Sequence, residues 1–464
     1  MPGPIAGSPT LWAVDAPLRV TVIGTGYLGA THAAAMAESG FEVLGVDVDA
    51  AKVDALSRGE VPFYEPGLSD LLAANVASGR LRFTTDFAEA AEFGDLHFLG
   101  VGTPQHPRTN AADLSQLDAA IDALAPLLRR PCTVVGKSTV PVGTAARVCE
   151  RLQALAPAGR DVDLVWNPEF LREGFAVADT LTPDRIVVGL ADPAEPGEPP
   201  TRDEQVMRRV YAPMIEWGSP FLVMDYATAE LVKVAANSFL ATKISFINAM
   251  SEVCEATGAD VTRLAEAIGF DERIGSKFLR AGVGFGGGCL PKDIRAFMAR
   301  AGELGVSDAL SFLRDVDAIN TRRRSATVAL ARELVGGRFV GKRIAVLGAA
   351  FKPDSDDVRD SPALDIAAAV YTAGGDVVVH DPQAIANARA AYPTMAYAES
   401  IAEALAGADL VMLGTEWRDY TELDPFDVVH LPSTPLVLDG RNALDVARWR
   451  RAGWTYRGLG RPNA

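Results

Sequence analysis

One short glycine motif constrains the fold of this chain more than any other feature. The run GTGYLG, Gly24 to Gly29, directly follows the β-branched stretch Arg19 to Ile23 and opens an Ala-rich helical stretch, Ala30 to Ser39. A GxGxxG motif between a strand and a helix is typical of dinucleotide-binding α/β domains. The first glycine makes the tight turn, the second lets a pyrophosphate approach the backbone, and the third allows close helix packing.

An acidic residue supports this interpretation of the turn. A second expected strand, Glu42 to Val46, is followed by Asp47, near the offset of about 20 residues at which such domains bind the ribose. The Asp47 carboxylate can accept hydrogen bonds from both ribose hydroxyls of NAD and would repel the 2′-phosphate of NADP. The alternative is a tight turn without a ligand, but the strand and helix around the motif favour an NAD site.

Strands and helices then alternate, which predicts a doubly wound parallel sheet. The further strands expected in this first part are 96–101, 133–136, 164–166 and 186–189. From Thr228 to Thr257 the chain has no Gly or Pro and is largely apolar, which predicts one long helix. More helical segments follow, to about Leu334.

A second α/β unit follows the glycine pair Gly336 and Gly337. Its expected strands are 343–347, 376–379, 410–413 and 436–438. The turn after its first strand, Gly348 to Phe351, lacks the glycine set, so we expect no second dinucleotide there. The predicted fold class is therefore α/β, with two Rossmann-like doubly wound domains joined by a long central helix and a helical region. The expected parts are a disordered tail (1–17), an NAD-binding domain (18–225), a central helical domain (226–335) and a second Rossmann-like domain (336–464).

Composition excludes several classes of function. The chain has 464 residues and a formal net charge of −16, and this acidic balance argues against nucleic-acid and anionic-membrane partners. Residues 1–17 contain no Lys or Arg, and we expect a tail there and not a signal peptide. We find no apolar run long enough for a transmembrane helix. The four cysteines form no CxxC pair, so we expect neither a disulfide framework nor a metal site, and a reducing cytoplasm is the simplest compartment.

The segment Gly282 to Asp293, GVGFGGGCLPKD, is the sharpest candidate for chemistry. Cys289 follows three consecutive glycines, and the next helix is expected over Asp293 to Ala301. At the positive end of that helix, and near Lys292, the thiolate form would be favoured. The glycines would allow a ligand to lie against the backbone. The alternative, a buried structural cysteine, would usually have apolar neighbours in sequence.

Polar residues on the long helix and after two strands complete the candidates. Four polar residues fall on one stripe of the helix: Glu230, Lys233, Asn237 and Asn248. The simpler interpretation is a stripe that faces solvent or pairs within itself. The alternative is that Lys233 faces a site, where a lysine could hold an oxyanion. The motifs STVPVGT and NPEFLREG each follow a strand. The carboxyl ends of strands line the ligand crevice of such sheets, which places Thr139, Glu169 and Glu173 near the first glycine turn, unless these motifs are ordinary turns.

Taken together, these motifs resemble the UDP-glucose/GDP-mannose dehydrogenase family, and more specifically its branch that acts on UDP-glucose. The resemblance covers about 19–453. The motifs that carry it are GTGYLG at Gly24, YEPGL at Tyr64, STVPVGT at Ser138, NPEFLREG at Asn167, ELVKVAAN at Glu230, DERIG at Asp271, FGGGCLPKD at Phe285 and FKPDSDDVRDSP at Phe351.

The resemblance implies oxidation of the C6 alcohol of UDP-glucose to UDP-glucuronate, with two NAD and one water consumed. It also implies a dimer built on the long helix and a carboxy-terminal domain that binds the nucleotide sugar. In that chemistry the aldehyde is trapped by a cysteine as a thiohemiacetal, then oxidised to a thioester and hydrolysed.

The resemblance also implies roles for individual residues. Cys289 matches the nucleophile, Lys233 and Asp293 the pair that activates the alcohol or water, Asn237 an oxyanion or substrate contact, Glu169 a carboxylate for thioester hydrolysis, and Thr139 a hydroxyl that positions water. Cofactor positions are Gly24, Gly26, Tyr27, Leu28, Gly29, Asp47, Lys52, Thr103, Ser138, Thr139, Glu173, Lys292 and Arg359. Substrate positions are Glu169, Phe170, Leu171, Lys233, Asn237, Phe278, Arg280, Gly286, Lys352 and Arg441, and Arg273, which matches an arginine that reaches into the neighbouring subunit's site.

Two departures from the family pattern concern the cysteine loop. Gly288 stands where Ser is common, and Leu290 stands where many UDP-glucose enzymes have Phe and GDP-mannose enzymes often have Leu. GDP-mannose and a UDP-N-acetylhexosamine therefore stay open as substrates. A non-catalytic NAD or nucleotide-sugar sensor and a single-step alcohol dehydrogenase are both disfavoured, because neither needs the nucleophile Cys289.

Overall fold

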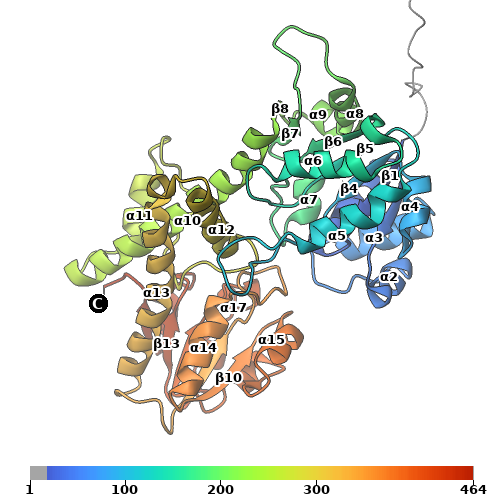
Figure 1. The fold of residues 1–464 in the computed structure, drawn as a ribbon. Helices are drawn as coiled ribbons and strands as arrows, with labels where there is room; N and C mark the ends of the chain where they lie inside the picture. The colour runs from blue at the N-terminus through green and yellow to red at the C-terminus, as the bar shows by residue number, and fades with distance from the viewer. Residues whose placement is uncertain (1–17, 463–464) are drawn as a thin grey trace, which may run out of the picture. The chain divides into compact units, whose positions relative to one another are not determined.

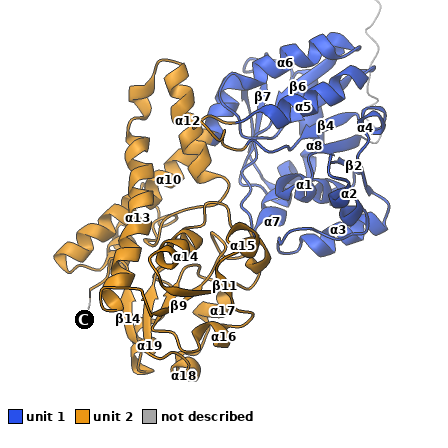
Figure 2. Ribbon diagram, turned by 60° about the horizontal axis from the view of Figure 1, so that its bottom comes forward, with its two compact units in different colours: residues 1–103, 113–233 blue, residues 104–112, 234–464 orange. Residues whose placement is uncertain are grey.

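The computed structural model describes residues 18–462, and the tail expected over 1–17 lies outside them. The chain divides into two compact units (Figure 2). Of the described residues, unit 1 contains 18–103 and 113–233, and unit 2 contains 104–112 and 234–462.

Unit 1 is built on an eight-stranded sheet with the order β3-β2-β1-β4-β5-β6-β7-β8 (Figure 1). Its strands are β1 (Arg19–Ile23), β2 (Glu42–Val46), β3 (Leu81–Thr84), β4 (Leu96–Leu99), β5 (Cys132–Gly136), β6 (Val162–Trp166), β7 (Ile186–Leu190) and β8 (Phe221–Asp225). The first six run parallel in the order of a doubly wound nucleotide-binding sheet. The last two pair parallel with each other, but β7 meets β6 in an antiparallel pair, so the predicted parallel sheet has two reversed strands at one edge.

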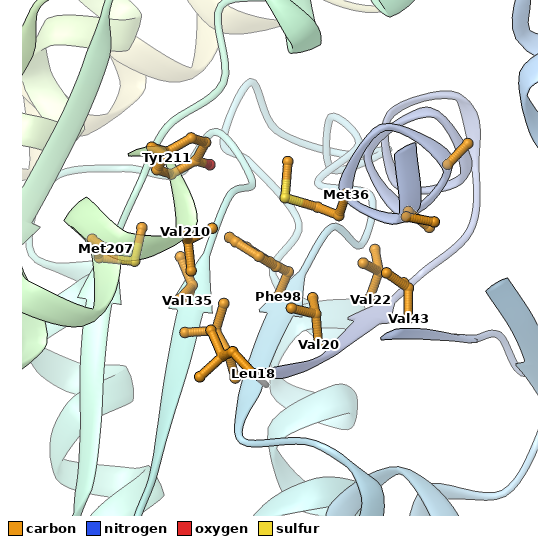
Figure 3. Packing of buried hydrophobic residues seen from close by; sticks show 14 of the residues in the cluster. Leu18, Val20, Val22, Met36, Val43, Phe98, Val135, Met207, Val210 and Tyr211 are labelled. Atoms are coloured by element: carbon orange, nitrogen blue, oxygen red, sulfur yellow. The ribbon is translucent and has the colours of Figure 1, made fainter. Parts of the chain in front are cut away.

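Helices cover both faces of this sheet. They are α1 (Tyr27–Glu38), α2 (Ala50–Ser57), α3 (Leu68–Ala77), α4 (Phe87–Phe93), α5 (Ser115–Leu124), α6 (Thr144–Leu155), α7 (Ala176–Leu181), α8 (Arg202–Val210) and α9 (Ala212–Trp217). Side chains alternate along the strands: Val22 and Phe98 belong to one hydrophobic cluster with α1, α3 and α8, whereas their neighbours Ile23 and Leu99 belong to another with α4, α5 and α6. Figure 3 shows the first cluster, in which Met36 of α1 and Val210 of α8 lie on either side of Phe98.

The long central helix is α10 (Tyr226–Thr257), with 32 residues, which confirms the predicted helix over 228–257. The other helices of unit 2 are α11 (Val261–Gly269), α12 (Leu290–Glu303), α13 (Phe312–Leu334), α14 (Pro362–Thr372), α15 (Ile385–Ala391), α16 (Ile401–Leu405), α17 (Arg418–Thr421), α18 (Pro425–Val428) and α19 (Val446–Arg451). Within the described chain, 18–462, we find no helix that combines the length and apolar character needed to cross a membrane.

The sheet of unit 2 is parallel throughout and repeats the same strand order, β11-β10-β9-β12-β13-β14. Its strands are β9 (Arg343–Leu347), β10 (Asp376–His380), β11 (Ala396–Tyr397), β12 (Leu410–Leu413), β13 (Leu436–Asp439) and β14 (Thr455–Gly458). The prediction of two Rossmann-like sheets and a long helix is therefore confirmed. Four strands were not predicted, and each lies at a sheet edge: β3, β8, β11 and β14.

Candidate active site

The glycine turn of unit 1 has the geometry that a dinucleotide pyrophosphate requires. Gly24 has φ +88°, a conformation that side chains disfavour, and a Cβ on Gly29 would lie 1.7 Å from the Gly24 carbonyl oxygen. At Gly26, by contrast, apart from its chain neighbours and its own helix, no heavy atom of the described residues would lie within 4 Å of a Cβ. The helix α1 begins at Tyr27, so its amino end faces open space, where a phosphate could accept its N–H groups.

Asp47 lies at the carboxyl end of β2, beside this turn. Its Oδ2 accepts hydrogen bonds from the Thr25 backbone N–H (2.9 Å), the Thr25 hydroxyl (3.0 Å) and Lys52 Nζ (2.9 Å). Burial opposes ionisation of Asp47, but Lys52 and the backbone N–H groups of Asp49 and Thr25 outweigh it, so the pKa of Asp47 is lowered. Thr25 was not singled out from the sequence because it occupies a variable position of the motif.

The loops after β5 and β6 carry most of the other candidates in unit 1. The Ser138 hydroxyl donates to the Val101 carbonyl (2.6 Å), and the Thr103 hydroxyl donates to the Thr139 carbonyl (2.8 Å). These two hydroxyls therefore tie the end of β5 to the chain that follows β4. Thr139 itself is half-buried.

Lys233 and Glu169 form a buried ion pair. Lys233 Nζ lies 3.0 Å from Glu169 Oε1, and the other carboxylate oxygen accepts the Leu171 backbone N–H at 2.9 Å. Their side chains are only 6% and 13% exposed. Two cations lie near the Phe170 ring: Arg185 Cζ is 3.8 Å and Lys233 Nζ is 5.5 Å from its centre. The structure thus brings together three of the predicted catalytic and substrate positions.

Lys137 is a buried cation near this pair that sequence analysis missed. Its Nζ donates to Asn167 Oδ1 (2.9 Å) and lies 3.3 Å from the Tyr211 hydroxyl. Burial lowers the pKa of Lys137 to about 8; the charge of Glu169 opposes this shift and that of Lys233 adds to it. Its position in the sequence, between a buried strand and the STVPVGT motif, was the one signal that could have predicted its burial.

Two glutamates clamp the loops that carry these residues. Glu65, in the YEPGL motif, accepts the backbone N–H groups of Gly174 and Ala176 at 2.7 Å each, at the amino end of α7. Glu230 accepts those of Gly143 (2.7 Å) and Ala145 (2.6 Å), at the amino end of α6. Both carboxylates compensate the positive end of a helix.

The polar stripe on α10 is therefore not solvated. All four side chains are buried, and each contacts a different segment. Glu230 and Lys233 contact the segments just described in unit 1. In unit 2, Asn237 Nδ2 donates to Asp293 Oδ2 (2.7 Å), and Asn248 Oδ1 accepts the Gly282 backbone N–H (2.9 Å).

In unit 2, Cys289 occupies the N-cap position of α12 and is exposed. The helix begins at Leu290, three residues earlier than predicted, because Pro291 is accommodated in its first turn. Asp293 is 2% exposed and lies one turn along the helix, where it accepts from Asn237 and from Lys292 Nζ (2.5 Å). A thiol at a helix amino end, with a buried carboxylate one turn away, suits nucleophilic and acid–base chemistry.

The glycines before Cys289 allow close packing within the chain, whereas their predicted contact with a ligand stays a prediction. A Cβ on Gly286 would lie 2.1 Å from the Asp360 carbonyl oxygen, and one on Gly287 would lie 2.7 Å from the Phe351 ring. At Gly288 it would lie 2.4 Å from Cζ of Arg359. The segment from Phe351 to Pro362 fills the space that side chains would need.

The remaining candidates lie on the surface or in loops of unit 2. Arg441 uses its three guanidinium nitrogens on the carbonyls of Gly414 (2.7 Å), Gly284 (3.2 Å) and Phe351 (3.1 Å) and is 12% exposed, so it braces loops. Arg359 is paired with Asp357, and Arg273, 89% exposed, is paired with Asp271. The positions of three others are as follows: Phe278 has φ +64°, Arg280 lies 3.6 Å from Glu416, and Lys352 Nζ lies 5.5 Å from the Phe351 ring centre.

Three sequence models of one family match successive parts of the chain. The UDP-glucose/GDP-mannose dehydrogenase family, NAD binding domain, matches residues 18–215; its central domain matches 227–322; and its UDP binding domain matches 345–446.

Individual relatives are similar over nearly the whole chain. UDP-glucose 6-dehydrogenase of Rhizobium meliloti is 41% identical, covering 96% of this chain and all of the relative. The enzyme of the same name from Pseudomonas aeruginosa is 40% identical, covering 96% and 98%. Among solved structures, a UDP-glucose dehydrogenase from the archaeon Pyrobaculum islandicum is 36% identical with a TM-score of 0.87, covering 98% of this chain and 100% of that one.

Proposed function

This chain belongs to the UDP-glucose/GDP-mannose dehydrogenase family, and we propose that it oxidises UDP-glucose at C6 to UDP-glucuronate in two NAD-dependent steps. The observation that carries the proposal is the exposed Cys289 at the amino end of α12, with the buried Asp293 one turn away. The names of the relatives and of the matched structure support UDP-glucose as the substrate.

The open approach to Gly26, the positive φ of Gly24 and the carboxylate of Asp47 suit NAD. When bound, NAD supplies the hydride acceptor. Asp293 and Lys233 activate the C6 hydroxyl as a pair: the Asp293 carboxylate takes up its proton as the hydride departs, and the Lys233 ammonium stabilises the developing charge on the oxygen. The Cys289 thiolate then adds to the aldehyde carbon, which leaves a thiohemiacetal that again carries a transferable hydride on C6.

The second oxidation converts the thiohemiacetal to a thioester on Cys289. Asn237, whose amide donates to Asp293, and Lys233 stabilise the oxyanion that forms during addition and hydrolysis. Glu169 assists the attack of water, positioned by Thr139, on the thioester. Hydrolysis releases the carboxylate and returns the free thiol, so each UDP-glucose consumes two NAD and one water.

The proposal divides the chain into an NAD-binding part (18–225), a central helical part (226–335) and a part for the nucleotide sugar (336–464). The three family domains, matched at 18–215, 227–322 and 345–446, support this division. Within the described chain the four cysteines form no disulfide, and together with NAD chemistry this is consistent with a reducing cytoplasm.

We also propose that the active form is at least a dimer built on α10. Leu231, Phe239, Phe246 and Val253 are 39%, 67%, 49% and 52% exposed, and their spacing of seven or eight residues places them along one face of the helix. An apolar stripe of this kind suits a second helix, here that of another copy. Arg273 would then complete the partner's site.

Mixing subunits tests this assembly. Arg273→Ala and Cys289→Ala chains are each expected to be inactive when alone. If sites are shared, mixed dimers contain some sites with neither defect, and part of the activity should return. A lack of recovery, despite subunit exchange proven by native mass spectrometry, would contradict sharing.

A panel of nucleotide sugars tests the reaction itself. NADH release and sugar consumption should be measured for UDP-glucose, GDP-mannose and UDP-N-acetylhexosamines. We expect two NADH per UDP-glucose and little turnover of the others. One NADH per sugar would contradict the two-step chemistry, and a preference for another sugar would contradict the substrate.

A further inference from the structure

On its amino-terminal side, the nucleophile Cys289 is separated by three glycines from the nearest buried apolar side chain, that of Phe285; on its other side, α12 begins at Leu290, which packs against the same hydrophobic cluster as Phe285. Phe285 lies in a hydrophobic cluster with Ala241, Ile294 and Leu313 and is 6% exposed. The next three residues, Gly286 to Gly288, have no side chains that could fix the path of the chain. The path of the chain into the thiol from the amino-terminal side therefore depends on how firmly the backbone at Phe285 is held.

The side chain of Asn320, on α13, binds both polar groups of the Phe285 backbone. Its Oδ1 accepts the Phe285 N–H at 2.8 Å, and its Nδ2 donates to the Phe285 carbonyl at 2.9 Å. One side chain thus satisfies both polar groups of one residue, as a neighbouring strand would. Asn320 is 1% exposed, so both hydrogen bonds are shielded from water.

The loop is shaped to receive this side chain. Gly284 has φ +103°, and a Cβ there would lie 2.5 Å from Asn320 Oδ1, so only glycine allows the approach. Arg324, one turn further along α13, donates a second hydrogen bond to the Phe285 carbonyl at 2.8 Å. Beyond Phe285, the Gly287 N–H donates to the Arg359 carbonyl at 2.9 Å.

We propose that Asn320 is a positioning residue for the nucleophile: its two hydrogen bonds to Phe285 fix the glycine loop so that Cys289 stands at the amino end of α12. The inference rests on the proposed role of Cys289 in the reaction. Asn320 touches neither substrate nor cofactor in this mechanism and acts only through the loop. Loss of the Asn320–Phe285 contact should therefore affect the thiol and the steps that use it more than ligand binding.

Two substitutions break the contact from opposite sides. Asn320→Ala removes both hydrogen bonds, and Gly284→Ala places a methyl group 2.5 Å from Asn320 Oδ1, which must then move. Each has a matched control. Ser245→Ala removes another buried hydrogen bond to α13, from the Ser245 hydroxyl to the Val316 carbonyl (2.7 Å). Gly336→Ala imposes a comparable positive-φ strain (φ +89°) where no other part of the described chain comes within 4 Å of a Cβ.

The first measurement is the rate at which iodoacetamide alkylates Cys289, followed by mass spectrometry of the intact protein and its peptides without substrate. Because a helix amino end favours the attacking thiolate, a displaced thiol should react more slowly, by about fivefold or more in both test variants. The controls should react at the wild-type rate. Circular dichroism confirms that each variant is folded.

The second measurement separates turnover from binding. A misplaced reacting group costs up to about 100-fold in rate, so kcat with UDP-glucose should fall by about 10-fold to 100-fold in both test variants. The Kd for UDP-glucose should stay near the wild-type value. Hydroxylamine should capture more aldehyde from the test variants than from wild type, because the thiol no longer traps it.

Wild-type alkylation rates in either folded test variant would overturn the proposal, as would equal slowing in its matched control. If the wild-type protein releases no NADH from UDP-glucose, the proposed function fails, while the alkylation result still decides the positioning role. The two conclusions can thus be distinguished.

Discussion

Removal of the Glu230 carboxylate should destabilise unit 1 and disturb the turn of α10 that carries Lys233. Glu230 is 2% exposed, and its two oxygens accept the backbone N–H groups of Gly143 (2.7 Å) and Ala145 (2.6 Å). Glu230→Ala leaves both donors at the amino end of α6 without this carboxylate. The same change releases α10 from the loop that carries Thr139.

The size of the effect follows from these two contacts. Hydrogen bonds to a charged group contribute about 1.5–3 kcal/mol each, which sets an upper range of about 3–6 kcal/mol for the pair. Desolvation of the carboxylate offsets part of this, so we expect a loss of about 3 kcal/mol. For a unit of this size, about 1 kcal/mol corresponds to roughly 2–4 °C, which gives a fall in Tm of roughly 6–12 °C.

The assay is thermal unfolding followed by circular dichroism, together with urea titration. The matched control is Glu252→Ala, on the same helix: Glu252 is 33% exposed and pairs with Arg322 at 3.2 Å, a surface pair worth about 0–1 kcal/mol. We expect a large shift for Glu230→Ala, a shift near zero for Glu252→Ala, and a lower kcat only in the first. Equal shifts in the two variants would refute the clamp.

Three further predictions concern charge and cofactor. Between about pH 8 and pH 10.5 only the unfolded chain still holds the Lys137 proton, so the free energy of unfolding should rise with pH by roughly 3 kcal/mol across this window. Lys137→Met should remove this rise in urea titrations, and an unchanged dependence of stability on pH would contradict the buried charge. Asp47→Ala should release Lys52 to bind the 2′-phosphate of NADP, so that the ratio of kcat/KM for NADP to kcat/KM for NAD rises by about tenfold or more. An unchanged ratio would argue against a role of Asp47 in excluding NADP. Gly288→Ser should displace the Arg359 guanidinium and raise the Kd for NAD by about threefold to tenfold in calorimetry, while the Kd for UDP-glucose stays unchanged. An unaltered Kd for NAD would argue against Arg359 as a cofactor contact.

Central strands could be predicted from the sequence because they are buried on both faces. The runs Arg19 to Ile23 and Arg343 to Leu347 are rich in β-branched residues and end at glycine turns, and both were predicted with their observed bounds. The strands at the sheet edges were not predicted. In β3 and β14, Arg82 and Arg457 interrupt the apolar pattern because these strands are partly exposed.

Residues of the candidate site were predictable where a local motif carried them. Cys289 stands beside glycines and a helix start, and Asp47 has a fixed offset from the glycine turn. Asn320 and Glu230 were not assigned their contacts, because their partners are backbone groups 35 and 85 or more residues away. Lys137 was overlooked because lysine is usually exposed, and only the fold shows that it is buried.

Rapid-quench mass spectrometry of wild-type and Cys289→Ser protein, mixed with UDP-glucose and NAD, tests the central claim most directly. The wild-type protein should carry the sugar nucleotide covalently on the Cys289 peptide during turnover and release UDP-glucuronate. The Cys289→Ser variant should still bind UDP-glucose and NAD, because the thiol contributes little to either, but its turnover should be largely lost. A serine hydroxyl is a poorer nucleophile than a thiolate, and its ester hydrolyses more slowly than a thioester. Near-normal steady-state release of UDP-glucuronate by this variant would contradict the proposed chemistry and leave the glycine loop without a nucleophile.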